Sequence, residues 1–280
     1  MKKILKKSIE IILKFVVLFL SKINLGRFIL EELNKNILNN KKVIIYKDSR
    51  LKFYTPNRLS YYRIDTFCTK EPETLEWIDK FEKKTTFWDV GANIGLYSCY
   101  AAKSKECQVY AFEPSIFNLE WLGRNIFLNN LVKKIVVIPI PLTEMISEST
   151  LNFSSTEWSG ALTTFGQSYG HDGKALKKVF EFSTLGISMN DAKNFLKIPQ
   201  PDYLKIDVDG IEHLILKGGE KILSNTREVL IEVNERFEQQ KNNCTKYLKK
   251  LGFNLKEKKN SDLLFKDTEF LSVYNQIWIK

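Results

Sequence analysis

The chain has 280 residues, a formal net charge of +10 and 44% hydrophobic residues. This length can bury one large α/β core with an appendage, and no linker rich in Pro, Gly or Ser divides the chain. The positive charge does not indicate a nucleic-acid partner, because lysine is spread along the whole sequence and no basic stripe alternates with aromatic residues.

Residues 1–40 are predicted to form an N-terminal helical segment. The segment starts with lysines and continues with apolar residues, but Lys14 interrupts it. The unbroken run Phe15 to Leu20 is shorter than the roughly 20 residues that span a bilayer, and no small-x-small site follows that would suit a signal peptide. Two interpretations stay open. The helix packs on the domain or on a second subunit, or residues 1–22 form an interfacial anchor whose lysines meet anionic lipid.

Residues 43–69 contain two or three short strand-like runs broken by polar turn residues, which predict a small hairpin before the core. Tyr61, Tyr62 and Arg63 lie in the third run, where they fit either simple packing or one wall of an acceptor site. A helix that begins near Thr74 is predicted to lead into the first core strand.

The most informative stretch is residues 87–97, FWDVGANIGLY, which predicts a buried strand, a glycine turn and a helix. Gly91 and Gly95 mark the turn, where the backbone bends sharply and leaves room for a ligand. A dinucleotide-binding turn reads G-x-G-x-x-G, whereas Asn93 replaces the middle glycine here. Asp89 precedes the first glycine by two residues, where it would repel phosphate and favour a ligand with a cationic end, such as S-adenosylmethionine.

A second buried strand is predicted at residues 108–114, ending in Glu113 and Pro114. Nucleoside-binding α/β folds keep an acid about twenty residues after the glycine turn for the ribose, and one carboxylate can accept from two adjacent hydroxyls. The following helix is predicted at residues 115–130. Four of its apolar residues are expected to form one core stripe: Leu119, Leu122, Ile126 and Phe127.

After a third strand at residues 134–140, the segment 149–184 is the least patterned part of the chain. Short alternating runs flank a polar, glycine-rich loop, which predicts an inserted hairpin above the ligand site, and such loops commonly select the substrate. Candidate acceptor contacts in the loop are Trp158, Ser159, Tyr169 and His171. An exposed loop residue without a role is the alternative for His171.

The next strand, Tyr203 to Val208, contains Lys205 and Asp207 and is followed by Asp209. Charges in an otherwise apolar strand are costly to bury unless they are paired. The three alternate along the strand and would share one face, which predicts pairing across a site. A purely structural salt bridge is the alternative.

Three stretches resemble the FkbM family of S-adenosylmethionine-dependent O-methyltransferases: DVGANIGLYS from Asp89, VYAFEPS within residues 109–115, and PDYLKIDVDGIE at residues 201–212. The resemblance implies a Rossmann-like class I methyltransferase fold of the α/β class, with a mainly parallel seven-stranded sheet and helices on both faces. It also implies one methyltransferase domain at residues 41–280, with core motifs within 85–235, that methylates a hydroxyl of a sugar, glycan or related metabolite.

The remaining sequence predicts the elements that complete this sheet. Residues 214–224 are predicted to form a helix broken at Gly218-Gly219, and residues 228–233 a strand. Glu232 lies inside this strand and is a further residue that could face the site. The last elements are a helix at 236–250 and strands near 253–258, 262–266 and 271–278, which end in the antiparallel pair typical of the family's fold.

On this resemblance the cofactor site comprises Asp89, Gly91, Ala92, Asn93, Gly95, Glu113, Pro114, Glu144 and Asp207. Glu144 would accept from the adenine amine or is a solvated loop acid. An alcohol needs a base within hydrogen-bond reach before it attacks the methyl group. The catalytic candidates are Asp209, Glu212, Lys205 and His213, with His171 as a candidate from the loop.

Other functions fit parts of the sequence. Asp207, Asp209 and Glu212 could hold a divalent ion instead of acting as a base, and spacing does not separate these roles. A non-catalytic module that binds S-adenosylmethionine or a glycan is less consistent with the intact acids, and an NAD-dependent oxidoreductase lacks its middle glycine. The cysteines are scattered without a C-x-x-C pair, which predicts a cytoplasmic protein, peripheral on the inner membrane face if the anchor is real.

Overall fold

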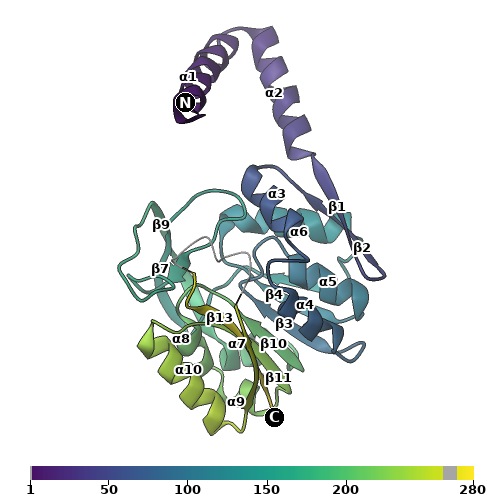
Figure 1. Cartoon of the computed structure of the whole chain (residues 1–280), viewed down its shortest axis with the longest axis vertical. Helices are drawn as coiled ribbons and strands as arrows, with labels where there is room; N and C mark the ends of the chain where they lie inside the picture. Colours follow the sequence, from purple (N-terminus) through teal and green to yellow (C-terminus); the bar gives the residue numbers. More distant parts are fainter. Residues whose placement is uncertain (1, 261–269) are drawn as a thin grey trace.

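A computed structural model of the protein describes residues 2–260 and 270–280 (Figure 1). Its central sheet has seven strands, in the spatial order β12 (Asn254–Lys259), β13 (Val273–Ile279), β11 (Glu228–Asn234), β10 (Tyr203–Ile206), β3 (Thr86–Val90), β4 (Gln108–Phe112) and β5 (Ile135–Ile138). The neighbours from β5 to β11 are parallel, whereas β13 is antiparallel to β11 and β12. The predicted α/β fold with a mainly parallel seven-stranded sheet is confirmed.

The strand order reverses beside β3. The chain builds outward from β3 to β4 and β5, and later returns to place β10 on the other side of β3. Open α/β sheets bind ligands outside the carboxyl ends of the strands at such a switch point. Val90 and Ile206 are partners in register at the ends of β3 and β10, so the topology places a ligand site next to these two residues.

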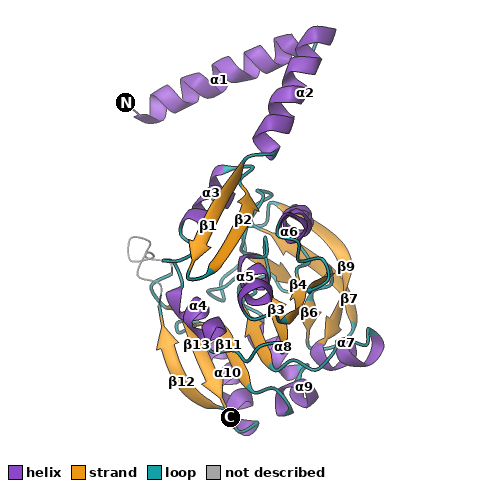
Figure 2. Cartoon of the chain, turned by 90° about the vertical axis from the view of Figure 1, so that its right-hand side faces the viewer, coloured by secondary structure: helices purple, strands orange, loops and turns teal. Residues whose placement is uncertain are grey.

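Helices cover both faces of the sheet, as predicted (Figure 2). One face carries α4 (Pro72–Asp79), α5 (Leu96–Ser104) and α6 (Ile116–Leu128). The other carries α7 (Met189–Phe195), α8 (Glu212–Lys217), α9 (Glu220–Ser224) and α10 (Glu238–Lys250). Phe87 and Trp88, adjacent in β3, lie in the separate cores of these two faces, because successive side chains of a strand point to opposite sides.

The inserted segment after β5 is larger than the predicted hairpin. It forms a second sheet in the spatial order β6 (Leu142–Thr143), β9 (Phe180–Ser188), β7 (Ser147–Phe153) and β8 (Thr163–Phe165). The two alternating runs at its ends fall within β7 and β9, which pair antiparallel as predicted. The sequence does not predict β8, since a run of three residues is too short for a strand pattern to emerge.

The N-terminal segment forms two helices, α1 (Lys2–Leu20) and α2 (Asn24–Leu38), which project away from the domain (Figures 1 and 2). Gly26 is buried at their junction, where a Cβ would lie 2.2 Å from the carbonyl oxygen of Leu20. Among the described residues, no helix has both the length and the apolar character needed to cross a membrane. The structure does not place α1 against the domain, so of the two interpretations of this segment, packing on a second subunit and an interfacial anchor stay predictions.

The small hairpin consists of β1 (Lys41–Tyr46) and β2 (Ser49–Tyr54), and the backbone of β2 is held by side chains of α6 and its C-terminal cap. The third strand-like run of this region is not a strand: it forms helix α3 (Arg58–Asp65). The reason is a local cap, because the side chain of Asn57 accepts a hydrogen bond from the backbone N–H of Ser60.

One residue of the predicted core stripe on α6 is misplaced. Leu122 and Ile126 are buried, four residues apart on one face, but Phe127 is 74% exposed. It lies one residue further around the helix, about 100° away from Ile126. The predicted strand at residues 262–266 lies outside the described residues.

Candidate active site

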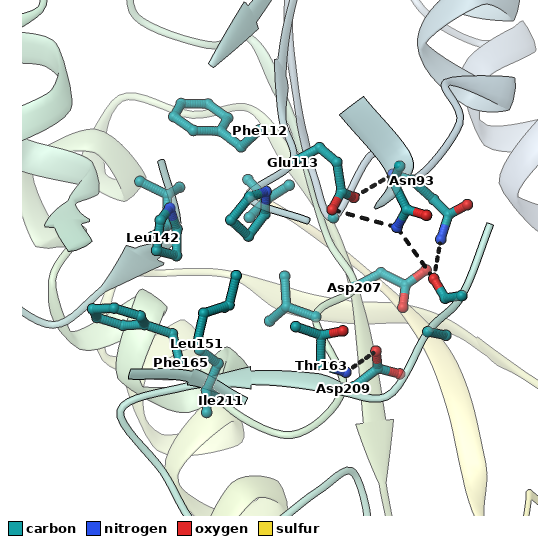
Figure 3. A pocket seen from close by; sticks show the side chains of 18 of the residues that line it. Asn93, Phe112, Glu113, Leu142, Leu151, Thr163, Phe165, Asp207, Asp209 and Ile211 are labelled. Atoms are coloured by element: carbon teal, nitrogen blue, oxygen red, sulfur yellow. Dashed lines mark hydrogen bonds between the residues drawn. The ribbon is translucent and has the colours of Figure 1, made fainter. Parts of the chain in front are cut away.

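Two adjoining chambers open at the carboxyl ends of β3, β4 and β10, and Figure 3 shows the larger one. The larger chamber contains about 730 Å³ of space, counting the part open to solvent. Arg63, Gly91, Asn93 and Asp207 line both chambers. The cavity therefore lies at the topological switch point of the sheet.

The glycine turn contributes to both chambers, through Gly91 and Asn93. Gly91 has φ +84°, and a Cβ on it would lie 1.8 Å from the carbonyl oxygen of Asp207. Gly95 has φ +83° and packs away from the cavity, where a Cβ would lie 2.6 Å from the Cδ1 atom of Leu122. Both positions need glycine for conformation and for space. Ala92, between them, lines the smaller chamber.

We predict that Gly91→Ala destabilises the protein by about 2–3 kcal/mol and distorts the turn, since the new methyl group meets backbone atoms and the residue has a left-handed conformation. Chemical denaturation measures this change. Gly123→Ala is the matched control, because Gly123 lies within α6 and has no atom within 4 Å of the new Cβ. That control is expected to be neutral or slightly stabilising. Equal stability of the two variants would contradict the prediction.

Glu113 lies on the wall of the larger chamber with its carboxylate fixed by the backbone. Its Oε2 atom accepts from the N–H of Asn93 at 2.7 Å, and its Oε1 atom accepts from the N–H of Ser115 at 2.9 Å. Burial raises the pKa of Glu113 to about 7, although these two hydrogen bonds act in the opposite direction. The carboxylate is therefore held ready to accept further donors from a ligand. Pro114 lines the same chamber.

The rest of the larger chamber has an apolar wall that the sequence analysis missed. Figure 3 shows Phe112, Leu142, Leu151, Phe165 and Ile211 around it. These residues come from β4, from three strands of the inserted sheet and from the loop after β10. The alternating pattern of β7 was a signal for one of them, but only the tertiary fold brings the five together.

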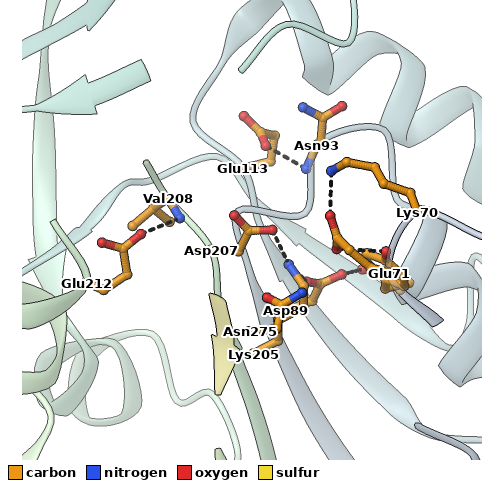
Figure 4. Close-up of polar contacts among 12 residues, drawn as sticks. Lys70, Glu71, Asp89, Asn93, Glu113, Lys205, Asp207, Val208, Glu212 and Asn275 are labelled. Carbon is orange, nitrogen blue, oxygen red and sulfur yellow. Dashed lines mark hydrogen bonds and ion pairs between the residues drawn. The ribbon is translucent and has the colours of Figure 1, made fainter. Parts of the chain in front are cut away.

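Lys205 is buried, lines the smaller chamber and is surrounded by carboxylates (Figure 4). Its Nζ atom is 2.8 Å from Oδ2 of Asp207 and 3.9 Å from Oδ1 of Asp89. Burial opposes the charge of Lys205, but Asp207, Asp89 and Glu71 outweigh it and raise its pKa. The predicted pairing of Lys205 and Asp207 across the strand end is therefore present.

Asp89 does not face either chamber. Its side chain is 1% exposed, and its Oδ2 atom accepts from the hydroxyl of Ser98 at 2.6 Å. In the neighbouring strand Lys205 is its partner in register. Burial raises the pKa of Asp89. The predicted direct contact between Asp89 and a cationic ligand is thus replaced by a contact with Lys205, because register puts these two residues side by side inside the sheet.

The smaller chamber also contains a pair of charged residues that the sequence analysis did not predict. Lys70 and Glu71 both line this chamber and form an ion pair, and Oε2 of Glu71 accepts from the hydroxyl of Tyr97 at 2.9 Å. Burial would raise the pKa of Glu71, but the charges of Lys70 and Lys205 lower it to about 2. The chamber therefore offers both positive and negative groups to a polar ligand.

Asp209 lines the larger chamber and holds the inserted segment in place. Strand β10 ends at Ile206, and Asp209 has φ +63°, so the predicted strand alternation does not reach it. Its Oδ2 atom accepts from the N–H of Leu162 at 2.7 Å. Burial first, and the charge of Asp207 second, raise the pKa of Asp209. Its second carboxylate oxygen has no hydrogen bond within the described part of the chain.

Glu212 and His213 lie outside both chambers. Glu212 is fully buried and accepts from the N–H groups of Val208 and Gly210, each at 3.1 Å, so it organises the loop after β10. Burial raises the pKa of Glu212 to about 7. His213 is buried against Phe237, and burial lowers its pKa. The structure therefore does not bring these two catalytic candidates to the cavity.

Most of the candidate acceptor contacts in the inserted loop serve packing. Trp158 packs against Trp121, Tyr169 packs against Phe237, and His171 stacks on Phe270. Ser159 is fully buried, and its carbonyl oxygen accepts from Nε of Arg63 at 2.7 Å. The neighbouring residues Gly160, Ala161 and Thr163 line the larger chamber instead.

Glu144 is also separate from the chambers. It pairs with Lys217 at 2.5 Å on the outside of the domain. Glu232 is close enough to Asp207 and Asp209 for their charges, added to burial, to raise its pKa well above the usual range. No group of three or more potential metal ligands is present among residues 2–260 and 270–280.

Residues 89–255 match the family model of the methyltransferase FkbM domain. The hexuronic acid methyltransferase AglP of Haloferax volcanii is 27% identical over 157 residues, which cover 56% of this chain and 59% of that protein. The methyltransferase sdnD of Sordaria araneosa is 29% identical over 207 residues, which cover 64% of this chain and 80% of that protein. The match to AglP thus spans less than two thirds of its length.

Solved structures of low sequence identity also resemble the chain. An FkbM methyltransferase from Methylobacillus flagellatus aligns with a TM-score of 0.48 at 15% identity, over 79% of this chain and 53% of that one. The TYW2 protein of M. jannaschii, in complex with AdoMet, aligns with a TM-score of 0.45 at 13% identity, over 85% of this chain and 84% of that one.

Proposed function

The chain belongs to the FkbM family of methyltransferases, and on that premise we propose that it transfers the methyl group of S-adenosylmethionine to a hydroxyl of a sugar, glycan or related metabolite. The position of Glu113 carries this proposal. Its carboxylate stands on the chamber wall beside the glycine turn, held by the N–H groups of Asn93 and Ser115, and ribose hydroxyls are the donors that such an acid accepts in nucleoside sites.

The residues present fit S-adenosylmethionine along the whole cavity. The apolar wall that includes Phe112 and Leu142 would pack against adenine, and Glu113 would hold the ribose. The methionine end would pass Gly91 into the smaller chamber. There Arg63 and Lys70 would pair with its carboxylate. Asp207 and Glu71 offer the negative charge for its ammonium group. When bound, S-adenosylmethionine supplies a methyl group activated by a cationic sulfur.

We assign the base to Asp209. An alcohol becomes a competent nucleophile when a base takes its proton, and that base works best with a pKa close to the working pH. Asp209 lines the larger chamber, one of its carboxylate oxygens has no hydrogen bond among the described residues, and burial raises its pKa. Asp207, which is ion-paired with Lys205, is assigned to the cofactor, and the methyl acceptor would approach between these two acids.

The acceptor class is proposed from the similarity to AglP, whose name gives hexuronic acid as its substrate. An assay with radiolabelled S-adenosylmethionine and a panel of neutral sugars, hexuronic acids and glycans tests it. Label in a sugar together with S-adenosylhomocysteine supports the proposal. Binding of S-adenosylmethionine without any turnover across the panel would favour the non-catalytic module instead. Mass spectrometry of cell glycans with and without the gene would then identify the methylated hydroxyl.

We predict that affinity for S-adenosylmethionine falls about tenfold from pH 8 to pH 6. With the pKa of Glu113 at about 7, its ionised fraction drops from about 90% to about 10% over this range, and the ionised form is the better acceptor for ribose hydroxyls. Calorimetric titration at both pH values measures the change. Glu113→Gln should bind weakly with no such pH dependence. Glu144→Gln, outside the cavity, should behave like the parent, and a pH dependence that survives in Glu113→Gln would contradict the assignment.

A further inference from the structure

Helix α1 has one strongly exposed apolar face. Its five most exposed apolar residues are Ile4, Leu5, Ile12, Phe15 and Phe19, each between 61% and 73% exposed. Their spacings of 4, 7 and 11 residues put all five within an arc of about 100° on the helix. The helix projects away from the domain (Figures 1 and 2), so no described part of the domain covers this face.

The opposite side of the same helix is basic. Lys6, Lys7 and Lys14 fall within a second arc of about 100°, on the far side from the apolar face. The whole helix contains five lysines and one glutamate, Glu10. An apolar face opposite a lysine-rich face is the arrangement of helices that lie in the interface of an anionic membrane, where the apolar side enters the acyl boundary and the lysines meet lipid head groups.

A second copy of the chain is a poorer partner for this face. In a helix pair, the residues that flank the apolar seam carry complementary charges. Here Lys6, Lys7, Lys14 and Glu10 all lie on the far side from the apolar face, so α1 places no acid beside the seam to pair with a lysine of a second copy. The acids of α2 do not supply these partners either, because Glu31 and Glu32 both form ion pairs with Lys35 of the same helix.

We propose that α1 docks on an anionic membrane surface and lies in its interface, with Ile4, Leu5, Ile12, Phe15 and Phe19 buried in the lipid. This inference does not depend on the methyltransferase chemistry. The docking helix is joined through α2 to β1 and the neighbouring α3, which are linked by the ion pair of Lys42 and Asp65. Since Arg63 of α3 lines both chambers, a docked α1 would hold the cavity on the membrane-proximal part of the domain.

Flotation of the full chain with vesicles tests the proposal. We expect at least tenfold more binding to vesicles with 30% phosphatidylglycerol than to pure phosphatidylcholine, and loss of this preference at high salt. The double variant Phe15→Ser, Phe19→Ser should lose binding at least tenfold. Val17→Ser is the control, because Val17 lies on the lysine side of the same helix, and it should bind like the parent.

Light scattering separates the rival partner. If the parent does not bind anionic vesicles but forms a dimer that Phe15→Ser, Phe19→Ser dissociates, the face belongs to a second copy and the proposal is wrong. Equal binding to neutral and anionic vesicles, or equal losses for Val17→Ser and the double variant, would overturn it as well. Affinity for S-adenosylmethionine, measured in the same variants, should stay unchanged and shows that the domain is folded.

Discussion

Asp209→Asn is expected to lower kcat about 100- to 1000-fold while S-adenosylmethionine binds within about threefold of the parent affinity. The amide oxygen of asparagine can still accept from the N–H of Leu162, so the inserted segment stays in place. What the variant loses is the ability to take a proton from the acceptor hydroxyl. Single-turnover kinetics, combined with calorimetry of cofactor binding, measures the two quantities separately.

Glu212→Gln is the informative comparison for this result. Glu212 binds the N–H groups of Val208 and Gly210 from outside the chambers, and glutamine retains an acceptor there. We expect a loss of less than about tenfold in kcat, without a change in its pH profile. A kcat of Asp209→Asn close to the parent value would move the base to another acid, and Asp207, which lines both chambers, would be tested next.

Lys205→Met is expected to lower the free energy of unfolding by about 3–5 kcal/mol, because it removes the cation between buried acids. The ammonium of Lys205 contacts Asp207 at 2.8 Å and lies 3.9 Å from Asp89, and its charge also acts on Glu71. Methionine has a similar length, so the change leaves the carboxylates uncompensated without opening a large cavity. Urea denaturation measures the difference.

Lys217→Met is the matched control for charge removal. Lys217 pairs with Glu144, but its side chain is 50% exposed, and exposed ion pairs contribute about 0–1 kcal/mol. If Lys205→Met were as stable as Lys217→Met, the ion pairs of Lys205 with Asp207 and Asp89 would not stabilise the protein, and the prediction would be wrong.

Local sequence was sufficient to predict the turn and the acid on the neighbouring strand. Gly91 and Glu113 were found because a strand, a glycine turn, a helix and a second strand follow one another within one βαβ unit, and the fold then brings the two strand ends together. The sequence also predicted that Lys205 and Asp207 pair, because charges in an apolar strand need a partner.

Features that depend on register or on distant segments could not be predicted in this way. Asp89 was expected to face the ligand, but strand pairing puts it beside Lys205 inside the sheet. Lys70 and Glu71 precede α4 and reach the smaller chamber only through the tertiary fold. Phe165 belongs to a strand of three residues whose pattern is too short to interpret.

Titration of the parent protein with S-adenosylmethionine, and in parallel with NAD, tests the cofactor assignment most directly. The geometry around Glu113 and the glycine turn predicts saturable binding of one S-adenosylmethionine per chain and no saturable binding of NAD at the same concentrations. Saturation by NAD together with no detectable uptake of S-adenosylmethionine would contradict the account.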